Sequence, residues 1–170
     1  MAEESKGRME DHGSEALRRL IAAMPEAICD THARLGDATA LVEAARIADV
    51  LHFLRDTPGL EFEMLVDLTA VDYLGETPRF EVVYHLLSLK HNHRVRIKAR
   101  VLESAPEIDT VVSVWPSAGW MEREVWDLYG IRFRGHPDLR RILLYEEFEG
   151  HPLRKDYPKE KRQPLIGPRN

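Results

Sequence analysis

Three strand-like runs between residues 62 and 101 constrain the fold of this chain most strongly. The run at 79–89 is nearly all apolar, which is typical of a central strand covered on both faces. Residues 94–101 alternate between apolar and basic side chains, so that one face of this strand carries Arg94, Arg96, Lys98 and Arg100. Because like charges repel, we expect the basic face to be wet or to meet acidic groups of the same domain or of a partner.

The rest of the chain adds shorter elements of both kinds. Residues 14–24 and 44–55 have the helical spacing of apolar side chains. Residues 27–35 and 38–42 alternate, which predicts a pair of short strands. With a third helix predicted at 117–129, the order αββαβββα contains runs of strands and favours an α+β fold. We expect a mixed five-stranded sheet with helices layered on one face, followed by an irregular C-terminal extension.

Length and composition indicate one compact domain with a disordered start and an extended end. A chain of 170 residues with 44% hydrophobic content buries roughly 70% of its extended-chain surface. We expect residues 1–13 to be disordered, residues 14–143 to form the domain and residues 144–170 to form an extended basic arm. No apolar run is long enough to cross a bilayer, and the start is unlike a secretory signal. Contact with a membrane is therefore expected only through other proteins.

Charge is distributed unevenly along the chain. Residues 130–170 contain 10 Lys and Arg against 6 Asp and Glu, whereas residues 1–129 contain 14 against 23. A basic end on an acidic body favours an arm that lies on another surface. Nucleic acid is not the expected partner, because acidic residues are mixed into the arm.

The helix predicted at 117–129 combines an apolar stripe with many charges. The stripe comprises Met121, Val125, Leu128 and Tyr129. Ser117 is the expected N-cap, and Gly130 is the expected left-handed C-cap. The charged residues Glu122, Arg123, Glu124 and Asp127 fall mostly elsewhere on the helical wheel. Spacing alone favours a surface helix with a solvated charged face, on which Arg123 and Asp127 could form a pair worth ~0.3 kcal/mol. The density of arginine and carboxylate residues between Glu122 and Lys155 favours instead a set that pins irregular backbone or anchors a partner chain.

Motifs for catalysis and metal binding are missing from the sequence. It has no Gly-rich phosphate loop, nucleophile elbow or paired cysteines, and the lone Cys29 excludes an intramolecular disulfide or a cluster held by four thiolates of this chain. His91 and His93 are the nearest pair for zinc but lack a third placed ligand. His136 and His151 each precede proline, and we expect them to orient loops by hydrogen bonding; a free-standing small enzyme would use one of them as a base. We predict an interaction module without catalytic, cofactor-binding or metal-binding residues.

Several blocks of sequence together resemble one protein family. The run Glu-Arg-Glu-x-x-Asp-Leu-Tyr at 122–129, then His136, Arg140 and Ile142-Leu143, resembles the signature of the C-type subunit of NADH-quinone oxidoreductase, the 30 kDa subunit family of respiratory complex I. The block at 148–158 and the strand-like runs at 65–73 and 80–89 are also similar to that family, so the resemblance extends from about Ser14 to Pro158. A match in several blocks is more specific than a single short motif.

The resemblance implies a non-catalytic subunit in the peripheral arm of complex I. It would dock on the D-type subunit that helps form the quinone site, near the iron–sulfur subunits, on the cytoplasmic side of the inner (plasma) membrane. The assembly passes electrons from NADH through FMN and iron–sulfur clusters to quinone and couples this to proton translocation, while this chain binds no cofactor itself. An equivalent subunit of a hydrogenase-type or photosynthetic complex, or an assembly factor, is the alternative.

The resemblance also implies which residues contact a partner or hold the contacting loops. These are Glu122, Arg123, Glu124, Asp127, His136, Asp138, Arg140, Arg141, His151, Arg154 and Lys155. We expect alanine at both Arg140 and Arg141 to leave the isolated domain folded while weakening partner binding.

Overall fold

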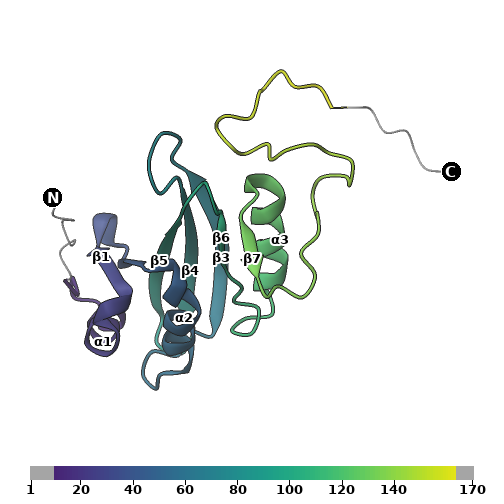
Figure 1. Ribbon diagram of the computed structural model, residues 1–170. Coiled ribbons are helices and arrows are strands. Elements are labelled where there is room, and N and C mark those ends of the chain that lie inside the picture. Colours follow the sequence, from purple (N-terminus) through teal and green to yellow (C-terminus); the bar gives the residue numbers. More distant parts are fainter. Residues whose placement is uncertain (1–9, 164–170) are drawn as a thin grey trace.

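A mixed five-stranded sheet organises the computed structural model, which describes residues 10–163 (Figure 1). The strand order is β1-β2-β5-β4-β3, and only the β2–β5 pair is parallel. The strands are β1 (Ile28–His32), β2 (Thr39–Val42), β3 (Met64–Asp72), β4 (Phe80–Ser88) and β5 (His93–Val101). The α+β class and the mixed sheet of five strands are confirmed.

Three α-helices supply residues to one hydrophobic core. They are α1 (Glu15–Ala23), α2 (Ile47–Asp56) and α3 (Ala118–Tyr129), and short 3-10 turns lie at Pro25–Ala27, Arg34–Gly36 and Ala44–Arg46. Leu17 of α1, Leu51 of α2 and Val125 of α3 belong to the same buried cluster as Tyr84 and Ile97 of the sheet. Tyr84 and Ile97 are cross-strand partners, so they define the face of the sheet that packs against the helices.

The opposite face of the sheet carries the basic side chains of β5. Lys98 Nζ lies 2.8 Å from Glu81 Oε1, Arg100 lies 3.4 Å from Glu81 Oε2, and Arg96 lies 2.6 Å from Asp37. We expected the basic face either to be wet or to meet acidic groups, and these ion pairs support acidic partners within the domain. On this side of β4, Glu81 and Val83 are buried, whereas His85 and Leu87 are half-buried. The prediction of a strand covered on both faces is therefore confirmed only for the first half of β4.

Two short strands were not predicted. Strand β6 (Glu107–Asp109) precedes α3, strand β7 (Arg132–Arg134) follows it, and the two pair in parallel. Three residues are too few for alternation to identify a strand, and the pairing joins residues 25 positions apart. The pair fixes both ends of α3 at one edge of the domain.

The chain from residue 135 to 163, here called the C-terminal segment, has no helix or strand. Figure 1 shows it running beside α3 and then crossing above the end of that helix. Of the residues predicted to be disordered, 1–9 lie outside the described part, while the Glu10 N–H bonds to Thr31 Oγ1 at 2.8 Å. Within residues 10–163 no helix is both long enough and apolar enough to cross a bilayer.

Candidate docking surface on α3 and the C-terminal segment

Helix α3 buries two carboxylates that its periodicity assigned to a solvated face. Glu122 and Asp127 are both 0% exposed. Met121, Leu128 and Tyr129 of the predicted stripe are only half-buried. The interpretation from helical spacing alone, a solvated charged face, is therefore wrong for Glu122 and Asp127. The reason is that donors from distant loops surround these two carboxylates, and helical spacing contains no information about those loops.

The two ends of α3 differ in how well the sequence predicted them. Ser117 occupies the N-cap position as predicted, but its backbone angles are helical (φ −61°, ψ −26°) and its side chain makes no cap bond with the described residues. Gly130 has φ +73°, which confirms the left-handed C-cap. A Cβ atom at Gly130 would also lie 2.6 Å from the His151 ring and 2.7 Å from Arg154 Nη2. The glycine therefore makes room for the C-terminal segment.

The Asp127 carboxylate fixes the loop that begins at residue 141. Its Oδ1 accepts from Arg141 Nη1 at 2.6 Å, and its Oδ2 accepts the successive backbone N–H groups of residues 142–144 at 3.1, 3.0 and 2.9 Å. Burial by itself raises the pKa of Asp127, but these hydrogen bonds outweigh it and hold the pKa below its usual value. Arg141 also donates to the carbonyls of Phe148 and Gly150, at 2.7 and 3.4 Å.

Arg123 holds the same loop from the outside of the helix. Its Nε donates to the Arg140 carbonyl at 3.0 Å and its Nη2 donates to the Arg141 carbonyl at 2.9 Å. The predicted surface pair of Arg123 with Asp127 is wrong, because both groups are used to hold the loop instead. The Arg123 guanidinium also lies 5.3 Å from the ring centroid of Trp120, which is 65% exposed.

The Glu122 carboxylate holds the chain between β6 and α3. Its Oε1 accepts the Val111 N–H at 2.7 Å, and its Oε2 accepts from the Thr110 hydroxyl at 2.5 Å and lies 4.0 Å from His136 Nε2. Burial raises the pKa of Glu122 to about 7, against the hydrogen bonds from Thr110 and Val111 that favour the charged form. The Glu122 carboxylate thus has two neutral hydrogen-bond donors and a histidine as neighbours, whereas the Asp127 carboxylate forms an ion pair with Arg141.

The two histidines predicted to orient loops do so. His136 Nε2 donates to the Gly119 carbonyl and its Nδ1 accepts the Asp138 N–H, both at 3.0 Å. His151 Nδ1 donates to the Asp127 carbonyl at 2.9 Å, and burial lowers the pKa of this imidazole. Both ring nitrogens of His136 are occupied by backbone groups, which leaves neither free to act as a base.

The C-terminal segment satisfies the end of α3. A helix leaves its last four carbonyls without partners inside the helix. Here the carbonyls of residues 126–129 each accept one hydrogen bond. The donors, in the same order, are Gly130 N–H at 2.8 Å, His151 Nδ1 at 2.9 Å, Leu153 N–H at 3.1 Å and Arg154 Nε at 2.6 Å. Three of these four donors come from the segment, so helix and segment form one structural unit.

A second attachment of the segment, here called the Arg79 cluster, was missed by the sequence reasoning. Arg79 is 2% exposed and uses all five of its N–H groups on three carboxylates. It binds Asp72 at 2.8 and 2.8 Å, Asp156 at 2.7 and 3.0 Å, and Glu103 at 2.6 Å. The Lys155 N–H donates to Asp72 at 2.8 Å, and the Arg79 hydrogen bonds lower the pKa of Asp72. In the sequence, the signal for this cluster was the position of Arg79 at the start of the apolar run at 79–89.

The residues predicted to contact a partner divide into a framework and an outer surface. The buried or half-buried framework consists of Glu122, Arg123, Asp127, His136, Arg141, His151 and Arg154. The outer residues are Glu124, Asp138, Arg140 and Lys155. Arg140 has a side chain 73% exposed and pairs at 3.0 Å with Asp138. Exposed apolar side chains, Trp120, Leu143 and Leu153, lie along the same helix and segment. We call these outer residues, polar and apolar, the candidate surface.

The family model for the 30 kDa subunit of the respiratory-chain NADH dehydrogenase matches residues 40–163, which include α3 and the whole C-terminal segment. The chain belongs to this family. The C-type subunit of NADH-quinone oxidoreductase from Roseiflexus castenholzii is 50% identical over 142 residues, which cover 84% of this chain and 82% of the relative. A C-type subunit of the same enzyme from Rhizobium meliloti, numbered 2 in that organism, is 56% identical over 117 residues, covering 69% of this chain and 64% of the relative.

Two solved structures share the fold of this 30 kDa subunit family member. A trypsin-resistant fragment of Nqo5 (residues 1–134) has a TM-score of 0.62 and 32% identity, covering 73% of this chain and 99% of the fragment. A chain of the membrane-bound sulfane sulfur reductase, an archaeal respiratory membrane complex, has a TM-score of 0.73 and 25% identity, covering 87% of this chain and 86% of that one. The identification made from the sequence blocks is confirmed.

Proposed function

We propose that the chain is a non-catalytic subunit in the peripheral arm of an NADH:quinone oxidoreductase and docks on the D-type subunit through the candidate surface. The observation that carries this proposal is the family match across residues 40–163, which covers α3 and the segment attached to it. In the assembly, electrons would pass from NADH through FMN and iron–sulfur clusters of other subunits to quinone, with proton translocation. The chain would lie on the cytoplasmic side of the inner (plasma) membrane, held there by its partners.

The attachment of the C-terminal segment supports a docking role. Irregular backbone normally loses conformational entropy when it binds, which weakens association. Asp127 and Arg79 each hold part of this segment through partly buried charged hydrogen bonds. A partner would therefore meet an ordered surface that carries Arg140 and exposed apolar side chains.

The chemistry of the single thiol and the histidines also favours a non-catalytic chain. Burial, and then a hydrogen bond with Glu43, raises the pKa of Cys29 to about 12, which keeps the sulfur as a thiol and not the thiolate that binds metals or attacks substrates. His136 has both ring nitrogens bonded to backbone. A free-standing small enzyme could therefore not use His136 as its general base.

A second candidate function is the same docking role in a complex with a different electron donor. The similarity to a chain of the sulfane sulfur reductase, with a TM-score of 0.73, favours keeping this alternative. If this fold occurs in respiratory complexes with different electron donors, the subunit on which it docks is one that those complexes share. That subunit is then not the one that binds NADH.

Deletion and complementation test the proposal. Membranes of a source-organism strain that lacks this chain should lose NADH:quinone activity, and expression of the full chain should restore it. Loss of a different respiratory activity would favour the second candidate. Unchanged membrane activities in the deletion strain would contradict both.

A further inference from the structure

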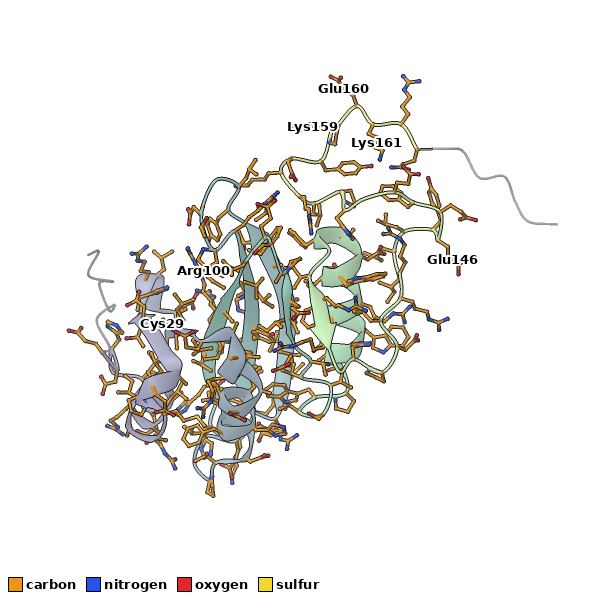
Figure 2. All side chains as sticks on the ribbon, viewed as in Figure 1. Cys29, Arg100, Glu146, Lys159, Glu160 and Lys161 are labelled. Atoms are coloured by element: carbon orange, nitrogen blue, oxygen red, sulfur yellow. The ribbon has the colours of Figure 1, made fainter. Side chains whose placement is uncertain are left out.

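The outermost part of the C-terminal segment, residues 155–163, presents basic side chains that form no ion pair within the described residues 10–163. Lys155, Lys159 and Arg162 are exposed and form no ion pair among those residues. Lys161 pairs with Glu149 at 3.4 Å, and Asp156 is held by Arg79. Within residues 155–163, three cations without an ion pair therefore accompany one carboxylate without an ion pair, that of Glu160. The charge of Lys155 also acts on the buried Asp72. We call Lys155, Lys159 and Arg162 the basic ridge. Figure 2 shows its Lys159, with Glu160 and Lys161, on the part of the segment farthest from the sheet.

The backbone beneath the basic ridge is fixed. The Lys155 N–H bonds to the buried Asp72 at 2.8 Å. Gln163 Nε2 donates to the Tyr157 hydroxyl at 2.7 Å and to the Glu149 carbonyl at 3.0 Å, which ties the two arms of the loop together. The Tyr157 ring stacks on Phe148 with centroids 6.2 Å apart. Charges on a fixed backbone select a complementary surface at a lower entropic cost than charges on a free tail.

We propose that the basic ridge docks on an acidic patch of a partner protein in the same assembly. This deepens the proposed function, on which it rests, by naming the chemistry of the partner surface. The charge distribution favours a protein over an anionic bilayer, because residues 1–129 carry 23 Asp and Glu against 14 Lys and Arg and would be repelled by anionic lipid. A small acidic patch attracts the ridge without requiring the acidic body to approach it.

The test uses the full chain and membranes from a strain that lacks it. Rebinding of purified chain to these membranes is measured at about 50 mM and about 300 mM KCl, within the range over which salt screens exposed charges. The variant is Lys159→Ser with Arg162→Ser, which leaves the Arg79 cluster and Lys155 intact. The control is Arg34→Ser with Arg94→Ser, two exposed arginines without ion pairs among residues 10–163. Vesicles of phosphatidylglycerol and of phosphatidylcholine form the lipid arm.

The variant is expected to rebind about fivefold more weakly than wild type at low salt, a loss that becomes small at high salt, while the control rebinds like wild type. Equal rebinding of variant and wild type at both salt concentrations would overturn the ridge proposal. Ridge-dependent binding to phosphatidylglycerol vesicles would overturn it in favour of lipid.

The activity of the same membranes separates the two proposals. If the variant restores NADH:quinone activity with unchanged affinity, the proposed function stands and the ridge proposal fails. If rebinding depends on the ridge but restores no NADH:quinone activity, the ridge proposal stands and the proposed function fails. Absence of any rebinding by wild type contradicts both.

Discussion

Asp127 and Arg141 form an ion pair at 2.6 Å in which the carboxylate is 0% exposed and the guanidinium side chain 16% exposed. The pair joins α3 to a loop that begins 14 residues later in the chain. The same carboxylate also accepts three successive backbone N–H groups of that loop. Much of the candidate surface therefore depends on one acidic residue inside a helix.

Replacement of Asp127 by asparagine should destabilise the protein strongly. The substitution keeps the shape of the side chain but removes its charge, leaving Arg141 and the backbone donors of residues 142–144 with a weaker acceptor. We expect the free energy of unfolding to fall by about 2–4 kcal/mol, as when one partner of a buried pair is lost. Urea denaturation measures this loss, and Glu124→Gln on the exposed side of the same helix is the control. A loss as small as that of the control would show that Asp127 does not hold the loop.

Alanine at Arg140 and alanine at Arg141 should have different effects. The sequence predicted that alanine at both arginines leaves the isolated domain folded. The contacts of Arg141 with Asp127 and with the Phe148 carbonyl favour a larger loss of stability for that residue. Arg140→Ala should change the free energy of unfolding by no more than about 0.5 kcal/mol, because its side chain is 73% exposed. Arg141→Ala should lower it by about 2–3 kcal/mol. Thermal and urea unfolding of the two single variants decide this, and equal effects would rule out the division into framework and outer surface.

Glu122 should make stability fall as the pH rises. Burial gives this carboxyl a folded pKa of about 7, above its usual 4.5. A raised pKa means that the neutral form favours folding, so its contribution is complete below about pH 4.5 and is lost as the pH rises through 7. Between pH 5 and pH 8, the free energy of unfolding of Glu122→Gln relative to wild type should rise by roughly 2–3 kcal/mol. Glu124→Gln should show no such trend, and parallel pH profiles for wild type and Glu122→Gln would contradict the assignment.

Loss of the Asp156 carboxylate should free the C-terminal segment without unfolding the domain. Asp156→Asn removes the ion pair with Arg79, which keeps Asp72 and Glu103 as partners. We expect trypsin to cut after Lys155 and Lys159 several-fold faster in this variant, while the sheet and α3 keep their circular dichroism. Glu160→Gln, which removes an exposed carboxylate of the same segment, is the control. Unchanged cleavage rates in Asp156→Asn would show that the Arg79 cluster does not hold the segment.

Local patterns were sufficient to predict the sheet and its three helices. The alternation at 94–101 and the apolar run at 79–89 are local signals, and they correspond to β5 and β4. Gly130 was predicted because a left-handed cap depends only on the helix it ends. The short strands β6 and β7 were missed, because each is stabilised mainly by the other.

The partners of the buried carboxylates in the candidate site could not be predicted from helical spacing. The Glu122 partners lie 11 and 12 residues away, and those of Asp127 lie 14 to 17 residues away. Arg79 and Asp156 are 77 residues apart. Spacing along a helix assigns charged residues to a face but does not reveal which distant donors cover that face. Spacing alone therefore assigned the Glu122 and Asp127 carboxylates to solvent, whereas the family resemblance assigned them to partner contact or to holding the contacting loops.

We propose that this chain works as part of a quinone-reducing respiratory assembly. The most direct measurement is purification of the tagged full chain from membranes of its source organism, with identification of the co-purifying chains and an NADH:quinone activity assay. We expect recovery of D-type, iron–sulfur and flavin-binding subunits together with that activity. Recovery of the chain alone, or with partners that have no quinone-reducing activity, would contradict it.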